Sequence, residues 1–240
     1  MLRGGAAAPA GIGTGEGGQR MATTKPGIGR AAARAHLSAC PVLGPVVAQV
    51  GPLRLSPVRR EPYEALVRAI AHQQVHGRAA EAMLARLLAL APAADFPPPA
   101  RVLALPEAAL RGCGFSAAKV AAIRDIAATA EAGQLPSRRA AGRLSDAELI
   151  ARLTALRGVG RWTVEMLLIF TLGRPDVLPV DDFGVREGYR LAAGLDAQPK
   201  PRDLATIGEA WAPHRSAAAW YLWRAADLAK QARREAPAAT

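Results

Sequence analysis

From Leu37 onward, apolar residues recur at helical spacing, and no stretch alternates apolar with polar residues as a half-buried strand does. Half of the 240 residues are hydrophobic, many of them alanine, and only 5% are aromatic. A chain of this length can bury a core in one or two domains, and this composition favours packed helices over a β-sandwich. The sequence therefore predicts an all-α fold.

The start of the chain has a different composition. Residues 1–34 are rich in Gly, Ala, Thr and Pro and show no hydrophobic period, so we expect a disordered tail before a helical domain over 35–240. The tail contains Gly13-x-Gly15-x-x-Gly18, which matches a dinucleotide-binding pattern by spelling alone. Because no strand precedes it and no helix follows, the pattern does not predict a nucleotide site.

Capping residues, prolines and glycines divide the rest of the chain into helices. Ser116 is expected to cap one helix, and Ser145 with Glu148 forms the capping-box pattern that opens another. The expected helices cover residues 38–50, 62–75, 78–90, 117–131, 146–156, 161–172, 182–193, 203–211 and 213–231.

The net charge points to a polyanionic partner. There are 31 Lys and Arg against 20 Asp and Glu, a formal charge of +11, which favours nucleic acid ahead of a membrane surface. No apolar run reaches the ~20 residues that span a bilayer, and the first residues lack a signal-peptide core. We expect a monomeric cytoplasmic protein, associated with a bacterial-type nucleoid.

The cysteines and histidines exclude several kinds of site. Cys40 and Cys113 are too few for a disulfide framework, a Cys-rich zinc site or a four-cysteine iron–sulfur cluster. His72 and His76 are four residues apart, a spacing that suits a metal, but no third ligand is evident. We therefore expect neither zinc nor an iron–sulfur cluster.

A very short glycine-bounded turn, Gly158-Val159-Gly160, joins two helices within a motif over about 146–172. Glycines permit positive φ and close approach, and the N–H groups that begin the second helix can bind a phosphate. The alternative interpretation is an ordinary αα-hairpin with a glycine cap. The flanking Arg157 and Arg161, together with the net charge, favour binding to a DNA backbone.

Two adjacent acids, Asp181 and Asp182, follow an apolar loop at the start of a further helix. Capping is the commonest use of Asp in this position. We expect one acid to cap the helix, which leaves the other available for catalysis.

Together, Leu-x-Gly-Val-Gly-Arg-Trp-Thr and Leu-Pro-x-Asp-Asp resemble the motifs of the helix-hairpin-helix (HhH-GPD) DNA glycosylases. Within that superfamily the chain is most similar to the DNA-3-methyladenine glycosylase II branch. Further matching stretches cover 69–75, 211–216 and 220–224, so the resemblance extends over about 37–228. It implies two helical lobes with the substrate cleft between them and C-terminal helices packed on the N-terminal lobe.

The resemblance also implies an activity in base excision repair. It is hydrolysis of the N-glycosidic bond of flipped-out 3-methyladenine or 7-methylguanine in double-stranded DNA, which leaves an abasic site. Asp182 would be the catalytic carboxylate and Asp181 the cap, because a fixed carboxylate stabilises oxocarbenium character on the deoxyribose. Trp162 stands where strand-cutting relatives carry a Schiff-base lysine, so the resemblance implies a monofunctional enzyme.

An alkylated purine is cationic, and electron-rich aromatic faces attract it by stacking and cation–π contact. The resemblance places Trp162 and Trp223 in the base pocket, with Phe183 and Tyr221 as neighbours. Core packing is the alternative for each tryptophan.

Two further DNA contacts, both of glutamines, are implied by the resemblance. Gln74 would fill the gap left by the flipped base and Gln73 would touch an adjacent base edge; a solvated helix end is the alternative. Lys119 is expected to contact a phosphate. Three hairpin carbonyls are expected to hold Na⁺ or K⁺, those of Thr154, Leu156 and Val159.

Two other functions remain open. One is a helix-hairpin-helix glycosylase for deaminated or oxidised bases, for which the polar Gln73-Gln74 pair leaves room. The other is a non-catalytic module that recognises DNA shape. Competition between methylated, hypoxanthine and 8-oxoguanine duplexes tests the first, and DNA affinity without base release would indicate the second.

Overall fold

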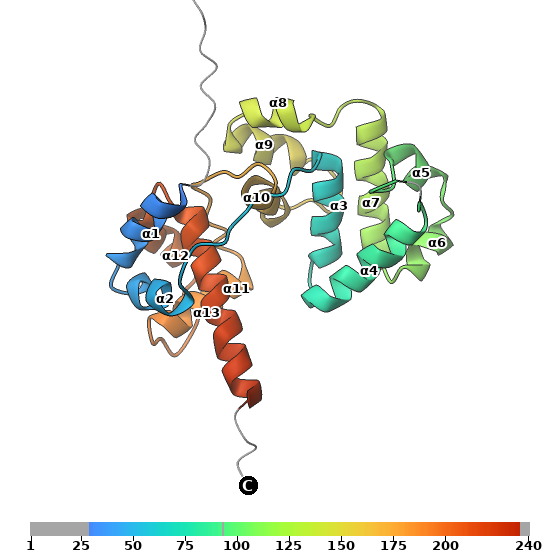
Figure 1. Ribbon diagram of the computed structural model, residues 1–240. Coiled ribbons are helices and arrows are strands. Elements are labelled where there is room, and N and C mark those ends of the chain that lie inside the picture. The colour runs from blue at the N-terminus through green and yellow to red at the C-terminus, as the bar shows by residue number, and fades with distance from the viewer. Residues whose placement is uncertain (1–28, 93, 236–240) are drawn as a thin grey trace, which may run out of the picture.

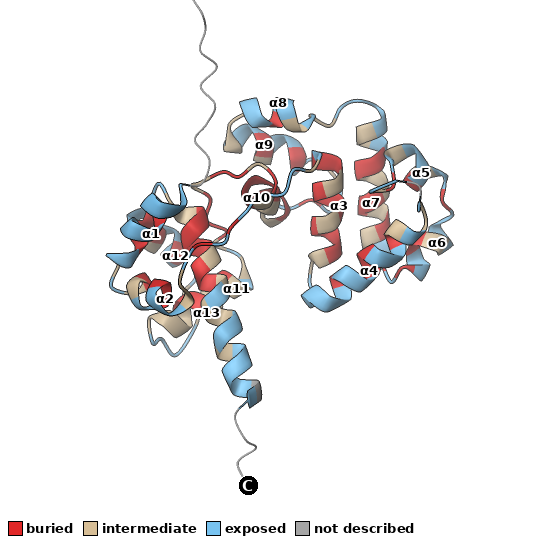
Figure 2. Cartoon of the chain, in the orientation of Figure 1, coloured by how far each residue is buried: buried red, intermediate tan, exposed pale blue. Residues whose placement is uncertain are grey.

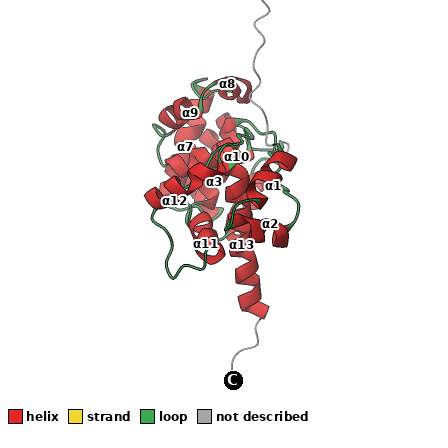
Figure 3. Cartoon of the chain, turned by 90° about the vertical axis from the view of Figure 1, so that its left-hand side faces the viewer, coloured by secondary structure: helices red, strands yellow, loops and turns green. Residues whose placement is uncertain are grey.

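The computed structural model describes residues 29–92 and 94–235, and every regular element in this part of the chain is a helix (Figure 3). The all-α prediction is confirmed. The elements are α1 (Arg30–Ser38), α2 (Leu43–Val50), α3 (Pro62–His72), α4 (Gly77–Ala89), α5 (Pro99–Ala104), α6 (Glu107–Gly112), α7 (Ala117–Glu131), α8 (Arg138–Arg143), α9 (Asp146–Leu153), α10 (Arg161–Phe170), α11 (Phe183–Ala192), α12 (Pro201–Ile207), the 3₁₀-helix η1 (Gly208–Trp211) and α13 (Arg215–Glu235).

The helices form two groups (Figure 1). In one, α3 packs against α4, α7 and α10, α5 and α6 pack against α7, and α9 packs against α10. In the other, the long helix α13 packs against α1, α2 and α11. The second lobe is therefore built from both ends of the described chain, and the hairpin between α9 and α10 belongs to the first.

The start of the helical region differs from the prediction. α1 begins at Arg30, inside the stretch 1–34 that we expected to be a tail, because Ala33 and Leu37 are one turn apart and both are buried. Ser38 ends α1 and does not cap a single helix to Val50; α2 is a separate helix. The Gly13-x-Gly15-x-x-Gly18 pattern lies outside the described residues.

Three helices were not predicted, namely α5, α6 and α8. Each is 6 residues long and buries a single side chain, Val102, Leu110 and Ala141 respectively. One buried residue cannot give an apolar period, so these helices lack the signal on which the prediction depended.

The two predicted helix starts are confirmed. Ser116 Oγ accepts a hydrogen bond from the backbone N–H of Lys119 at 3.3 Å, which caps α7. At α9, Ser145 Oγ accepts from Glu148 N (3.1 Å) and Glu148 Oε2 accepts from Ser145 N (2.6 Å). This capping box fixes where α9 begins and so sets the position of the hairpin that follows.

Close contact between α11 and α13 positions the beginning of α11. A side chain at Gly188 would overlap the backbone of Leu222, so only glycine allows the two helices to approach this closely. Buried residues line the faces where the helices meet, while the last turns of α13 are exposed (Figure 2). None of the described helices is long and apolar enough to cross a membrane.

Candidate active site

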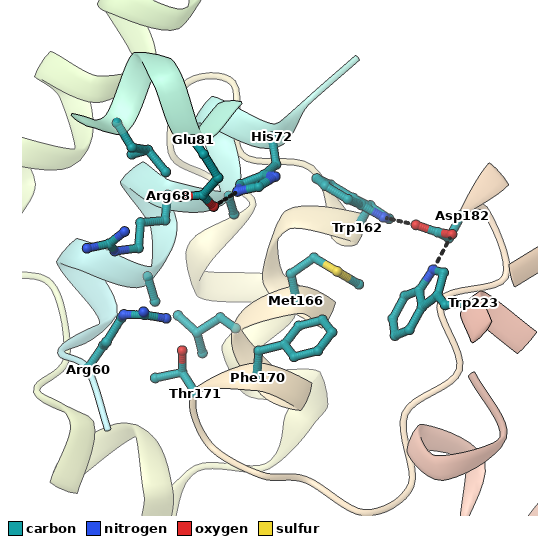
Figure 4. A pocket seen from close by; sticks show the side chains of 14 residues that line it. Arg60, Arg68, His72, Glu81, Trp162, Met166, Phe170, Thr171, Asp182 and Trp223 are labelled. Atoms are coloured by element: carbon teal, nitrogen blue, oxygen red, sulfur yellow. Dashed lines mark hydrogen bonds and ion pairs between the residues drawn. The ribbon is translucent and has the colours of Figure 1, made fainter. Parts of the chain in front are cut away.

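A cavity of about 360 Å³ lies between side chains of α3, α4, α10 and α13 and the start of α11 (Figure 4). One wall comes from α10 and the second lobe, and the other comes from α3 and α4. The side chains labelled in Figure 4 are Arg60, Arg68, His72, Glu81, Trp162, Met166, Phe170, Thr171, Asp182 and Trp223.

Asp182 lies at the edge of this cavity and is held by three N–H donors. Its Oδ1 accepts from the backbone N–H of Val185 (2.9 Å) and from Trp223 Nε1 (2.8 Å), and its Oδ2 accepts from Trp162 Nε1 (2.7 Å). An ionised carboxylate only accepts hydrogen bonds, so three donors complement it and fix its orientation.

The prediction that Asp181 caps the helix is wrong. The N-cap of α11 is Asp182 itself, through its contact with Val185, while Asp181 is exposed. The sequence pattern had suggested different acids for capping and for catalysis. A carboxylate has two oxygens, so Asp182 can cap the helix and still face the cavity.

The two tryptophans form the aromatic wall. Trp162 lies in the first turn of α10, and Trp223 of α13 stacks on Phe170 with ring centroids 5.5 Å apart and an interplanar angle of 30°. Each indole N–H is committed to Asp182, which fixes the ring beside the carboxylate. A flat heteroaromatic ring bound here would meet aromatic faces and Asp182 together.

The structure does not bring Phe183 or Tyr221 into this cavity, and the prediction for Tyr221 is wrong. Phe183 is 71% exposed and lines a neighbouring groove that Trp162 and Asp182 also line, so its place beside a bound base stays a prediction. Tyr221 is fully buried in the second lobe, where its hydroxyl donates to the carbonyl of Gly51 (3.0 Å). Tyr221 lies two residues before Trp223 on α13, a spacing that places the two side chains on different faces of the helix.

The groove next to the cavity has a volume of about 850 Å³ and opens between the hairpin and the end of α3. Trp162 and Asp182 line both the cavity and the groove. At the hairpin, Gly158 has φ +73°, and a Cβ there would lie 2.8 Å from the Cβ of Ala122 on α7. Glycine is therefore required for the turn and for its packing. Gly160 precedes α10 as its N-cap and also lines the groove.

Gln73 and Lys119 hold the hairpin against the end of α3. Gln73 Nε2 donates to Gly158 O (3.0 Å) and Thr163 Oγ1 (2.9 Å). Lys119 Nζ donates to the carbonyls of Ala71 (2.9 Å) and Gln73 (2.8 Å), and burial lowers its pKa. The predicted phosphate contact of Lys119 is therefore corrected, because its ammonium group serves the protein's own backbone. Gln73 uses its amide N–H groups within the protein and still lines the groove, so its contact with a base edge stays a prediction.

Gln74 differs from Gln73. It is exposed, lines the groove and has φ +52°, the one positive φ among the described non-glycine residues. Such a backbone conformation persists only where the surroundings enforce it, and it is common at ligand-binding positions. The bonds that Gln73 and Lys119 make supply that enforcement.

The two arginines beside the hairpin have different surroundings. Arg157 is exposed, and its backbone N–H donates to Asp125 Oδ2 (2.8 Å). Arg161 donates to Glu165 Oε1 (2.8 Å), so part of its charge is neutralised. Burial raises the pKa of Glu165 to about 7, against the opposing effect of Arg161.

The carbonyls expected to hold a monovalent cation all lie in the turn between α9 and α10. Thr154 is the C-cap of α9, and the Leu156 carbonyl accepts from Val159 N (3.1 Å). Carbonyl oxygens are suitable ligands for a hard cation, so the donor set fits Na⁺ or K⁺, and the site remains a prediction.

Several cavity residues were not predicted from the sequence. Met166 and Phe170 follow Trp162 at four and eight residues, a helical spacing that would have placed all three on one face. Arg60, Arg68 and Glu81 carry no local signal, because only the packing of α3 and α4 brings them to the cavity. His72, considered with His76 as a metal pair, instead pairs with Glu81 (3.2 Å).

Comparison with known proteins agrees with this geometry. The family profile described as "HhH-GPD superfamily base excision DNA repair protein" matches residues 67–214. The chain is 45% identical over 171 residues to DNA-3-methyladenine glycosylase 1 of Schizosaccharomyces pombe. The aligned region covers 71% of this chain and 75% of the relative.

Solved structures give the same result. The S. pombe 3-methyladenine DNA glycosylase Mag1 in complex with abasic DNA superposes with a TM-score of 0.78 at 42% identity, covering 80% of this chain and 95% of that chain. DNA-3-methyladenine glycosidase of Bacillus halodurans superposes with a TM-score of 0.65 at 32% identity, covering 81% and 93%. The chain therefore belongs to the HhH-GPD superfamily of base excision DNA repair proteins.

Proposed function

We propose that this protein is a monofunctional DNA glycosylase that hydrolyses the N-glycosidic bond of alkylated purines, such as 3-methyladenine and 7-methylguanine, in double-stranded DNA. The observation that carries the proposal is Asp182, which the indole N–H groups of Trp162 and Trp223 fix at the edge of a cavity of about 360 Å³ with an aromatic wall. The named relatives, which are 3-methyladenine glycosylases, support the substrate class.

The reaction follows from the arrangement of charge and aromatic surface. A flipped purine enters the cavity and stacks on the aromatic wall, with its sugar beside Asp182. As the glycosidic bond breaks, positive charge develops on the deoxyribose, and the Asp182 carboxylate stabilises it. The carboxylate can also orient the attacking water. Alkylation makes the purine a better leaving group, so one positioned carboxylate is sufficient for the reaction.

DNA is held by the hairpin and the groove. The N–H groups at the start of α10 and the exposed Arg157 contact the backbone near the lesion. Gln74, at the exposed turn after α3, enters the minor groove in place of the flipped base. We expect the protein to act as a monomer on DNA in the nucleoid.

Strand cleavage is not part of the proposed activity. A lyase needs an amine that forms a Schiff base with the sugar, and none of the described lysines lines the cavity or the groove. The expected product is an intact strand with an abasic site.

The experiment is incubation with methylated duplex DNA and, in parallel, with duplexes that contain hypoxanthine or 8-oxoguanine. Released bases are identified by mass spectrometry, and strands are examined before and after alkali. We expect free 3-methyladenine and 7-methylguanine, and strand breaks only after alkali. Release of hypoxanthine or 8-oxoguanine in preference to these bases would replace the substrate class. DNA binding without any base release would contradict a catalytic function.

A further inference from the structure

The wall of the cavity formed by α3 and α4 carries a histidine–carboxylate pair. His72 ends α3 and Glu81 lies on α4, and His72 Nε2 is 3.2 Å from Glu81 Oε1. Both side chains line the cavity that contains Asp182 and Trp162 (Figure 4). Neither residue is needed to hold Asp182, whose three donors come from α10, α11 and α13.

The chemistry of the pair makes it an acceptor. A carboxylate only accepts hydrogen bonds, so the contact places a proton on His72 Nε2. In the neutral form of the ring, Nδ1 is then an acceptor. Glu81 has two oxygens and uses one of them for His72, which leaves capacity for another donor. His72 and Glu81 are 37% and 67% exposed, so a ligand in the cavity can reach both.

The position of Asp182 determines which edge of a base meets this pair. The sugar must lie beside Asp182, so the base edge remote from the glycosidic bond points across the cavity, toward α3 and α4. In 3-methyladenine that edge carries the exocyclic amino group, and in 7-methylguanine it carries the N1–H and the 2-amino group. Both lesions therefore present N–H donors to acceptors.

The charges on this wall give Glu81 a second effect. Arg60 and Arg68 also line the cavity, and both guanidinium groups pair with one carboxylate, that of Glu64 (3.1 and 2.7 Å). One carboxylate cannot balance two arginines. Glu81 supplies the second negative charge, without which the wall would repel a cationic purine.

We infer that the His72–Glu81 pair determines specificity by accepting hydrogen bonds from the amino-bearing edge of the flipped, positively charged purine. This inference rests on the proposed glycosylase function and adds the element that reads the base. Glu81 contacts the base or acts through His72 as a positioning residue, and the two roles are distinguished by substitutions of His72.

The test compares Glu81→Gln with wild type in two measurements on the full chain. The first is the single-turnover rate of base release from a duplex that contains one 7-methylguanine. We expect a loss of about tenfold or more, the effect of one hydrogen bond to a charged group. The second is the affinity for a duplex with an abasic site, which has no base for the pair to contact; it is expected to stay within about twofold.

Glu131→Gln is the matched control, because Glu131 is exposed at the end of α7 and lines neither the cavity nor the groove. His72→Leu is expected to slow release as Glu81→Gln does. His72→Asn, whose amide oxygen can accept near the Nδ1 position, is expected to restore part of the rate if His72 is the contact.

The outcomes separate this inference from the proposed function. A wild-type protein that releases no 7-methylguanine would contradict the proposed function itself. An active wild type with an equally active Glu81→Gln variant would overturn only the inference. Equal losses of release rate and abasic-DNA affinity would also overturn it, since they would indicate a general defect of the cleft.

Discussion

Asp182 both caps α11 and presents its carboxylate to the cavity. One oxygen caps α11 and accepts from Trp223, and the other accepts from Trp162. The cap fixes the backbone at Asp182, and the indoles fix its carboxylate. The tryptophans therefore both line the cavity and hold the Asp182 carboxylate in place.

This dual role of Trp223 is testable with Trp223→Phe. Phenylalanine keeps an aromatic ring beside Phe170 but removes the N–H that donates to Asp182 Oδ1. We expect base release to slow by roughly tenfold, since one donor to a charged acceptor is lost, with DNA affinity retained. Trp220→Phe, on the same helix but outside the cavity, is the control. Equal rates for the two variants would show that the N–H has no role.

Glu165 predicts a pH dependence of stability. Its pKa is raised from 4.5 to about 7 by burial, so the folded protein holds this proton more tightly than the unfolded chain. The contribution of Glu165 to the free energy of unfolding therefore falls as pH rises from 4.5 to 7 and is constant above that range.

Glu165→Gln removes this effect. We expect the variant to be more stable than wild type above pH 7, by at most about 3 kcal/mol, and the difference to shrink as pH falls towards 4.5. Urea unfolding across this pH range measures it, with Glu131→Gln as an exposed control. A stability difference that does not change with pH would contradict the assignment.

At the scale of elements, local sequence signals predicted the hairpin. Contacts between residues far apart in the sequence determine the second wall of the cavity. The capping box at Ser145, the glycine at 158 and the apolar face of α10 are all readable within a few residues. The second cavity wall was not readable, because Glu81 reaches it only through the packing of α4 on α3. Tyr221 was misplaced for a similar reason. It lies in the same matching stretch as Trp223, residues 220–224, but its side chain is buried in the core.

The packing of the hairpin against α7 can be tested by substitution of Gly158. In Gly158→Ala, the new Cβ would meet Ala122 while the backbone keeps φ +73°. We expect a loss of stability of roughly 1–3 kcal/mol and weaker DNA binding. Ala122→Gly in the same chain removes the contact but not the backbone strain, so a double-mutant cycle should give a favourable coupling energy.

Gly160→Ala is the matched control, because Gly160 has φ −91° and open space where a Cβ would lie. Its effect on stability is expected to be small. If the two alanine variants were equally stable, the close approach of the hairpin to α7 would not be a constraint on the fold.

At the scale of the whole molecule, the charge of +11 brings the protein to DNA without choosing the lesion. We expect the logarithm of DNA affinity to fall linearly with the logarithm of salt concentration, by about 0.9 per phosphate neutralised. Arg157→Ala should reduce the slope by about that amount, because its guanidinium is exposed beside the hairpin.

Arg202→Ala is the comparison, since Arg202 is 80% exposed and lies outside the cavity and the groove. Titration of fluorescent duplexes at several salt concentrations gives both slopes. Equal slopes for Arg157→Ala and wild type would place the backbone contact elsewhere.

The central claim is that the Asp182 carboxylate performs the chemistry, and the single-turnover rate of 3-methyladenine release by Asp182→Asn tests it most directly. Asparagine also caps helices, so this variant removes the charge while preserving the start of α11. We predict a loss of at least about 100-fold, with DNA binding retained, and a loss of less than about threefold for the neighbouring Asp181→Asn, since Asp181 makes none of the indole contacts. An Asp182→Asn protein that releases 3-methyladenine at the wild-type rate would contradict the account.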